Sequence, residues 1–282
     1  MRRSRRGGFI RGAVRSGLWI ARPRAFEFAQ VSGGALSALP ANTIPTFRET
    51  DVKPSNIDWT QIRCELDAHG CATITALLPP RVCTELAACY AEDALFRSRV
   101  VMARHGFGRG EYKYFTYPLP QPVAALRENF YPPLATIANG WNDAMGIDLR
   151  YPEKHAAFLE QCRKAGQTKP TPLLLRYGPG DYNCLHQDVY GETVFPLQLA
   201  VLLSEPERDF TGGEFVLTEQ RPRMQSRAEV VPLKQGDGVI FPVNTRPVRG
   251  SRGIYRVNMR HGVSRLRAGE RFTLGVIFHD AA

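Results

Sequence analysis

The feature that most restricts the fold of this chain is a series of short apolar segments that begins near residue 171. Glycine-containing turn signals such as Gly212-Gly213 and Gly236-Asp237-Gly238 separate these segments, and no internal repeat relates them. The apolar segments span residues 171–177, 194–204, 213–218, 228–233, 237–243, 253–260 and 271–279. Short strands at regular spacing, each bounded by a turn, predict a β-sandwich or β-barrel.

The N-terminal half carries helix signals instead. Ser55 or Asn56 can cap a helix that ends near Gly70, and Pro80 is placed to open a second helix. Further helical patterns cover residues 134–145 and 155–165. We therefore expect an α+β fold in a single domain over residues 51–282, with a helical part at 51–170 packed on a β-core at 171–282.

The net charge of +10 is concentrated in two segments rather than spread over the chain. Residues 1–24 hold eight arginines and no acidic residue, and residues 220–271 hold 12 basic residues against 3 acidic ones. We expect residues 1–50 to be a basic, flexible extension and linker. Arg11 and Arg15 interrupt every apolar run there, so the segment does not resemble a secretory signal.

Cysteine spacing and hydropathy suggest a cytoplasmic protein. The six cysteines form no CxxC pair, so we expect reduced thiols in a cytoplasm. No apolar window is long enough for a transmembrane helix, which requires about 18–20 residues, and we expect no membrane partner.

A candidate metal site is centred on His186 and Asp188, which form an HxD pair. On a strand, residues i and i+2 face the same side, so this imidazole and carboxylate can bind one ion. His261, 75 residues later in a strand-like segment, is the candidate third ligand. Two histidines and one carboxylate are the ligand set of non-haem Fe(II) oxygenases, which keep the remaining coordination positions open.

A candidate co-substrate anchor follows ten residues after His261. Arg271 and Thr273 face the same side of the predicted last strand. A guanidinium can hold a carboxylate through two hydrogen bonds, and the hydroxyl can add a third. The remote carboxylate of 2-oxoglutarate requires such an anchor, while its 2-oxo acid end can chelate Fe(II).

On these residues the chain resembles the 2-oxoglutarate/Fe(II)-dependent dioxygenase superfamily. Further similarities lie in Phe210-Thr211-Gly212-Gly213-Glu214-Phe215, which is like a turn of the prolyl-hydroxylase-like members, and in Gly236–Pro242 and Arg260–Val263. The resemblance implies a double-stranded β-helix, or jelly roll, with iron inside its mouth. It also implies Fe(II), 2-oxoglutarate and O2 as cofactors and co-substrates, and ascorbate can serve as a reductant.

The resemblance extends to four further residues. Related enzymes often place a tyrosine at the position of Tyr177 to bind 2-oxoglutarate, and Asn183 is a second candidate contact to the co-substrate. For the substrate, Arg221 and Arg223 are candidate contacts to a phosphate backbone. A solvated basic loop would equally explain these arginines. Tyr112 and Tyr114 are candidates for a lid or for stacking on a flipped base, although we expect core packing for at least one of them.

The function that we expect is hydroxylation of a C–H bond with release of succinate and CO2. The segments Glu219–Arg227 and Leu274–Asp280 resemble a bacterial branch described as oxygenases that demethylate damaged DNA oxidatively. That branch and the basic segment favour an alkylated, single-stranded nucleic acid as partner. The prolyl-hydroxylase-like turns favour a protein side chain, a free amino acid or another small anionic substrate. A non-catalytic, cupin-like binding module is the third alternative, but it would not need Arg271 and Thr273.

Overall fold

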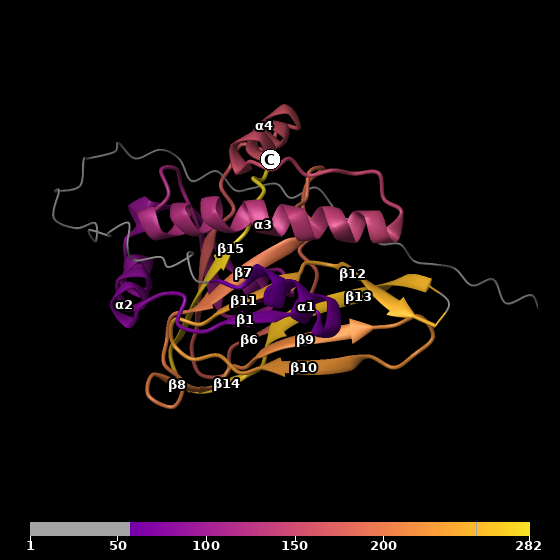
Figure 1. The fold of residues 1–282 in the computed structure, drawn as a ribbon. Coiled ribbons are helices and arrows are strands. Elements are labelled where there is room, and N and C mark those ends of the chain that lie inside the picture. Colours follow the sequence, from indigo (N-terminus) through magenta and orange to yellow (C-terminus); the bar gives the residue numbers. More distant parts are fainter. Residues whose placement is uncertain (1–56, 252) are drawn as a thin grey trace, which may run out of the picture. The chain divides into compact units, whose positions relative to one another are not determined.

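Two antiparallel β-sheets form the core of the part of the chain that the computed structural model describes, residues 57–251 and 253–282 (Figure 1). The larger sheet has seven strands in the order β1-β11-β7-β15-β5-β4-β2. The smaller sheet has the order β10-β9-β13-β6-β3, with β12 paired to β13, and a separate two-stranded sheet joins β14 to β8. This arrangement confirms the predicted α+β fold with a jelly-roll core.

The helices precede most of the strands in the chain. The α-helices are α1 (Trp59–His69), α2 (Pro80–Ala88), α3 (Gln121–Met145) and α4 (His155–Lys164), with short 3-10 turns η3 (Cys89–Ala91), η4 (Asp93–Leu95) and η5 (Met102–Arg104). The strands before residue 180 are β1 (Ala72–Ile74), β2 (Phe96–Val101), β3 (Gly108–Arg109), β4 (Glu111–Phe115) and β5 (Leu173–Tyr177). The later strands are β6 (Tyr182–His186), β7 (Leu197–Leu202), β8 (Phe210–Gly212), β9 (Phe215–Gln220), β10 (Arg227–Val231), β11 (Gly238–Pro242), β12 (Thr245–Gly250), β13 (Gly253–Val263), β14 (Leu266–Gly269) and β15 (Arg271–Val276).

The larger sheet has helices on one face and the smaller sheet opposite its other face. Leu274 and Val276 of β15 belong to the same apolar cluster as Leu126 and Leu134 of α3, which crosses this sheet in Figure 1. Because side chains alternate along a strand, residues such as Arg271 point the other way, between the two sheets. Arg271 and the other residues on its face of β15 therefore point into the space between the two sheets, on the side away from the helices.

Local sequence signals explain the ends of α1. Its first turn is capped by Asp58, whose carboxylate accepts hydrogen bonds from the backbone amides of Thr60 and Gln61, both at 3.0 Å. Its last turn ends at Gly70, which has the left-handed φ of 80° that glycine tolerates best. The predicted end near Gly70 is therefore confirmed.

Three features of the N-terminal half differ from the sequence-based expectation. The cap of the first helix is Asp58 rather than Ser55 or Asn56, so that prediction is wrong. The helix expected over 134–145 begins at Gln121 as α3, and Pro132 and Pro133 lie inside it. The part expected to be helical, 51–170, also contributes strands, since β4 pairs with β5 and β2 pairs with β4 to extend the larger sheet. The expected extension at residues 1–50 lies outside the described residues.

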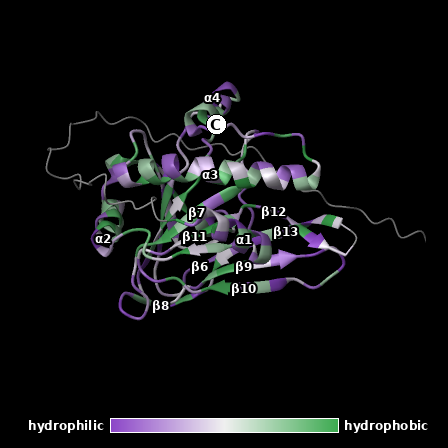
Figure 2. Cartoon of the chain, in the orientation of Figure 1, coloured by the Kyte–Doolittle hydropathy of each residue, from purple (hydrophilic) through white to green (hydrophobic). Residues whose placement is uncertain are grey.

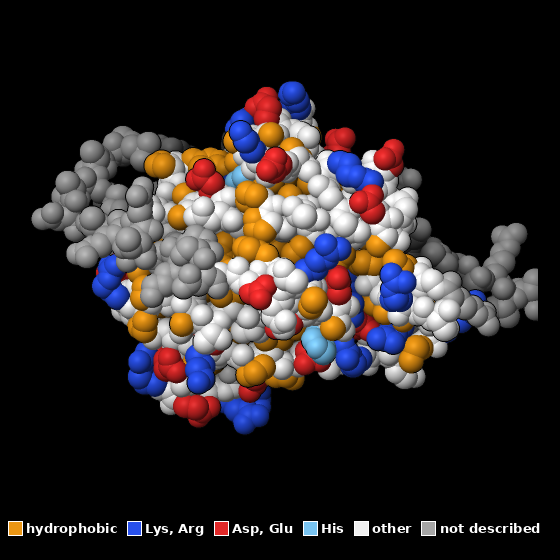
Figure 3. Space-filling view, viewed as in Figure 1, with side chains coloured by type: hydrophobic (Ala, Val, Ile, Leu, Met, Phe, Trp, Pro, Cys, Tyr) orange, Lys and Arg blue, Asp and Glu red, His pale blue; other side chains and the backbone are white. Residues whose placement is uncertain are grey.

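The surface of the described chain carries both signs of charge. The hydropathy colouring of Figure 2 shows apolar positions in the strands of the core and on the side of α3. On the face drawn in Figure 3, basic and acidic side chains are interspersed. None of the helices in the described part of the chain combines the length and apolar character needed to cross a membrane.

Candidate metal and co-substrate site

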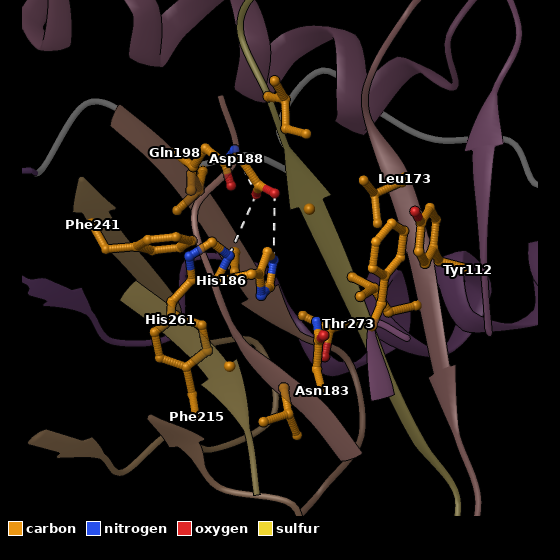
Figure 4. Close-up of a pocket in the computed structure, with 18 of the residues that line it drawn as sticks. Tyr112, Leu173, Asn183, His186, Asp188, Gln198, Phe215, Phe241, His261 and Thr273 are labelled. Carbon is orange, nitrogen blue, oxygen red and sulfur yellow. Dashed lines mark hydrogen bonds and ion pairs between the residues drawn. The ribbon is translucent and has the colours of Figure 1, made fainter. Parts of the chain in front are cut away.

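A cavity of about 150 Å³ lies between the two sheets and collects the predicted site residues (Figure 4). Strand β6 and the segment after it, together with β13, line one side with the three candidate metal ligands. Strands β5, β7 and β15 of the larger sheet line the other side. The walls are largely aromatic and aliphatic, and they include Phe107, Tyr112, Tyr114, Leu173, Leu175, Tyr190, Phe215 and Phe241.

The three predicted metal ligands converge at one end of this cavity. His186 and His261 are direct cross-strand partners of β6 and β13, and their ring centroids are 4.2 Å apart. Asp188 Oδ1 lies 3.4 Å from His186 Nε2, and Asp188 Oδ2 lies 3.4 Å from His261 Nε2. One possible ligand atom from each residue falls within 4.8 Å of the others, so a single ion can contact all three.

The surroundings set the protonation of this trio. Burial alone would raise the pKa of Asp188, but hydrogen bonds from His186 and His261 hold that pKa well below its usual range. Burial and the neighbouring His186 lower the pKa of His261, which favours the neutral imidazole that binds metals. Burial opposes protonation of His186, but its contacts with Asp188 and the bond from its Nδ1 to the Cys184 carbonyl oxygen at 2.8 Å raise the pKa of His186. A metal ion bound there would take the place of the proton on Nε2.

Arg271 stands in the same cavity as a buried cation. Its side chain is 1% exposed, and no carboxylate among the described residues forms an ion pair with it. Its Nη1 donates to Thr273 Oγ1 at 2.6 Å, and its Nε has no hydrogen-bond partner in the described structure. Burial lowers the pKa of Arg271 to about 10. A buried charge without a counter-ion is costly, so this position favours an anionic ligand.

Two further predicted contacts adjoin Arg271. Tyr177 is its direct cross-strand partner, and the guanidinium carbon lies 5.7 Å from the centre of the Tyr177 ring. The Tyr177 hydroxyl is buried and has no hydrogen-bond partner in the described structure. Asn183 of β6 also lines the cavity, on the side of the metal ligands. The structure therefore brings together all seven residues predicted for metal and co-substrate: Tyr177, Asn183, His186, Asp188, His261, Arg271 and Thr273.

The double-glycine turn before β9 gives Arg271 its space. Gly212 and Gly213 have φ values of +71° and +65°, a region that favours glycine. A Cβ on Gly213 would lie 2.6 Å from Leu266 Cδ1 and 3.1 Å from Arg271 Cδ. The turn motif seen in the sequence thus shapes the side of the cavity that holds Arg271.

The four residues predicted to meet the substrate divide into two pairs. Tyr112 and Tyr114 line the cavity and pack edge to face, with ring centres 5.3 Å apart. Arg221 and Arg223 lie in the turn between β9 and β10 and are not among the residues that line the cavity. Arg221 Nε pairs with Glu219 at 2.7 Å, and Arg223 is exposed. Contact of the two arginines with a phosphate backbone stays a prediction.

Sequence reasoning missed three residues that matter here. Arg246 is one of the 12 basic residues of the segment 220–271, but it is 1% exposed and pairs with the buried carboxylate of Glu219. Tyr190 lines the cavity although it is 44% exposed, which places it at the opening. Gln198 donates from Nε2 to Asp188 Oδ2 at 2.9 Å. A lone amide inside the apolar run 194–203 was the signal that could have identified Gln198.

These residues fit both groups that the sequence implies. Two imidazoles and one carboxylate suit Fe(II), and they leave positions for further ligands. The unpaired guanidinium of Arg271 and the unpaired hydroxyl of Tyr177 suit a carboxylate in the same cavity. Within this cavity, the Tyr177 hydroxyl and Arg271 Nε are therefore buried groups without partners that a keto diacid could satisfy.

Comparison with known proteins identifies a protein family that this chain matches. Residues 110–281 match the Oxygenase-NA family, whose description is "Oxygenase, catalysing oxidative methylation of damaged DNA". Two proteins of Mycobacterium tuberculosis strains, MT2286 and Rv2227, both named as uncharacterized, are each 46% identical to this chain over 197 residues. That match covers 68% of this chain and 84% of each relative.

Solved structures with a similar arrangement include prolyl hydroxylases. A Pseudomonas putida prolyl-4-hydroxylase has 17% identity and a TM-score of 0.43, covering 77% of this chain and 96% of its own. A Trichoplax adhaerens prolyl hydroxylase in complex with a hypoxia inducible factor peptide has 15% identity and a TM-score of 0.46, covering 78% and 88%.

Proposed function

Because this chain belongs to the Oxygenase-NA family of oxygenases, we propose that it uses Fe(II) and 2-oxoglutarate to demethylate damaged DNA by oxidation. The resemblance to oxygenases seen in the sequence is thereby confirmed, and the non-catalytic module is not supported. The observation that carries the proposal is the buried, unpaired Arg271 in the same cavity as His186, Asp188 and His261.

Each residue has a role that follows from its position. His186, Asp188 and His261 would hold Fe(II). Arg271 would bind the remote carboxylate of 2-oxoglutarate through two parallel N–H groups. Thr273 already accepts a hydrogen bond from Arg271, so its own hydroxyl proton is free to reach the same carboxylate.

When bound, Fe(II), 2-oxoglutarate and O2 supply a two-electron oxidation of a C–H bond, with succinate and CO2 as co-products. One oxygen atom enters succinate and the other enters the substrate. On an N-methyl group the product is a hydroxymethyl amine, which loses formaldehyde and leaves N–H. The protein contributes the position of the methyl group and the exclusion of water.

The walls of the cavity favour an uncharged, flat target group. Apart from the metal ligands, Arg271 is the only charged residue among the described residues that line the cavity. A free amino acid would bring an ammonium and a carboxylate group. With Arg271 bound to 2-oxoglutarate and Asp188 bound to the metal, neither group would find a free counter-charge among these residues. Tyr112, Tyr114 and Tyr190 instead offer aromatic faces, on which a base can stack for about 1–3 kcal/mol.

The size of the cavity points the same way. Its 150 Å³ is below the roughly 300–1,000 Å³ of pockets that enclose a whole drug-sized ligand. A large substrate would therefore insert one group and leave the rest outside. A base turned out of a nucleic-acid strand meets this requirement.

The test is formaldehyde release from methylated single-stranded DNA, measured with succinate formation at several salt concentrations. We expect both products in equal amounts, with weaker substrate binding as salt rises, because phosphate contacts release counter-ions. Asp188→Ala is the inactive control. Absence of formaldehyde from DNA, together with a product 16 Da heavier on a peptide, would reverse the proposal in favour of a protein hydroxylase.

A further inference from the structure

Gln198 is a polar side chain in an unusually apolar place. It lies in β7, a central strand of the larger sheet, and is 5% exposed. Its cross-strand partner is Phe241, and the next residue on the same face of β7 is Ala200. A buried amide that finds no hydrogen bond destabilises the fold, so its partner indicates why it is there.

That partner is the carboxylate of Asp188. Gln198 Nε2 donates to Asp188 Oδ2 at 2.9 Å, so an amide of the larger sheet holds a side chain that follows the smaller sheet (Figure 4). Asp188 is in the segment after β6 and before β7, where no ladder fixes the backbone. Its carboxylate is therefore oriented by side-chain contacts, of which the bond from Gln198 at 2.9 Å is shorter than the contacts with His186 and His261 at 3.4 Å.

Gln187, the residue before Asp188, further restricts the position of this segment. Gln187 Nε2 donates to the carbonyl oxygens of Asn244 and Met259, at 3.0 and 2.9 Å. Gln187 thus ties the start of the segment to the smaller sheet, while Gln198 holds the Asp188 side chain from the larger sheet. The two contacts come from opposite sides and restrict where the carboxylate can turn.

We propose that Gln198 is a positioning residue that keeps Asp188 a one-oxygen ligand of the metal. This inference rests on the proposed function. A carboxylate can bind a metal through one oxygen or through both, and an amide N–H on Oδ2 occupies the oxygen that a two-oxygen mode needs. One-oxygen binding leaves open the coordination positions that 2-oxoglutarate and O2 require.

Without the amide, Asp188 is free to rotate and to chelate the metal with both oxygens. The metal would then have one fewer open coordination position for the co-substrate. Alternatively, the carboxylate would turn away from the metal and the metal would bind more weakly. Groups that orient metal ligands typically change metal affinity or activity by about 10–100-fold when they are removed. We expect a change of that size here.

The test uses Co²⁺ as the probe, since its visible absorption reports the coordination number. Gln198→Met keeps the length of the side chain and removes the donor. We expect Co²⁺ binding weakened about 10–100-fold, a changed Co²⁺ spectrum and weaker 2-oxoglutarate binding to the Co²⁺-loaded protein. Gln198→Leu also removes the donor but has a different side-chain shape. If circular dichroism shows that one variant is misfolded, the other variant still tests the proposal.

Gln235→Met is the matched control, because Gln235 donates to the Leu203 carbonyl oxygen at 2.8 Å and does not line the cavity. It should bind Co²⁺ with the spectrum and affinity of the wild type. The proposal is overturned if Gln198→Met and Gln198→Leu match the wild type, or if Gln235→Met shows the same loss.

The outcome for Gln198 is separable from that of the proposed function. A wild-type protein that binds Co²⁺ and 2-oxoglutarate but releases no formaldehyde from DNA would refute only the DNA reaction. A wild-type protein that binds no Co²⁺ would refute the metal centre and the role of Gln198 with it.

Discussion

Replacing Arg271 with methionine should leave the stability of the ligand-free protein unchanged or raise it, while it weakens the binding of 2-oxoglutarate. In the ligand-free protein, Arg271 is a buried cation whose one hydrogen-bonded side-chain partner is neutral, Thr273 at 2.6 Å. Replacement of buried charged groups by apolar ones is often neutral or stabilising by about 1–4 kcal/mol, from which the lost hydrogen bond subtracts about 1 kcal/mol. We expect Arg271→Met to be as stable as the wild type or up to about 3 kcal/mol more stable.

Binding of 2-oxoglutarate should fall steeply in the same variant. Hydrogen bonds that involve a charged group contribute about 1.5–3 kcal/mol each, so two of them amount to about 3–6 kcal/mol. At about 1.4 kcal/mol per tenfold, Kd should rise roughly a hundred- to ten-thousand-fold. Titration calorimetry on the metal-loaded protein measures this change, and urea unfolding without ligand measures the stability.

Arg246→Met is the matched comparison, since Arg246 is also 1% exposed. Its removal leaves the buried carboxylate of Glu219 with one partner, the half-exposed Arg221. We expect a loss of stability of about 3 kcal/mol, the lower end of the range for breaking a buried pair, because Arg221 remains. An Arg271→Met protein that is as destabilised as Arg246→Met, or that binds 2-oxoglutarate like the wild type, would refute the argument that Arg271 awaits an anion.

Three further outcomes follow from the site and the core. Asp188→Ala should no longer retain Fe(II) through anaerobic gel filtration, and metal bound at wild-type stoichiometry would contradict the ligand trio. Gly213→Ala should weaken 2-oxoglutarate binding in calorimetry more than Co²⁺ binding, because its Cβ would lie 3.1 Å from Arg271 Cδ and 2.6 Å from Leu266; equal losses of both would point to general unfolding. Burial, and after it the charge of Arg127, lowers the pKa of His155 from 6.5 to about 4. As the pH drops from 6.5 to 4, the imidazole is therefore protonated in the unfolded chain before it is protonated in the folded protein, and the free energy of unfolding falls. This loss of unfolding free energy amounts to about 3 kcal/mol near pH 4. The His155→Phe variant should lack it when urea unfolding is compared at neutral and acidic pH, and an unchanged acid dependence would rule out His155 as its source.

Residues whose role follows from strand periodicity were predictable from the sequence. Arg271 and Thr273 are an i and i+2 pair within β15, so alternation placed both on one face. His186 and Asp188 do converge, but β6 ends at His186, so the expectation that a strand carries both residues is wrong. The short apolar runs also located strands such as β7 and β11, because buried strands are nearly continuous in apolar residues. The positions that alternation orients toward the interior are the ones on which the site is built.

Features that depend on tertiary contacts were not predictable. The Phe96–Val101 segment has Arg97, Ser98 and Arg99 between its apolar ends and gives no simple strand signal, yet β2 pairs with β4 at the edge of the larger sheet. Pro132 and Pro133 hid the true length of α3, whose packing on the sheet outweighs their local cost. The burial of Arg246 depends on Glu219, 27 positions away along the chain, which charge counting cannot detect.

The division of the site between the two sheets has a consequence for how such an enzyme can change. The imidazoles proposed as metal ligands belong to β6 and β13, whereas Arg271, Thr273 and Tyr177 belong to β15 and β5 of the other sheet. Substitutions that alter the preferred keto acid can therefore accumulate on one sheet while the choice of metal stays with the other. An engineer could retune either specificity separately, provided that the amide of Gln198 continues to join the two halves.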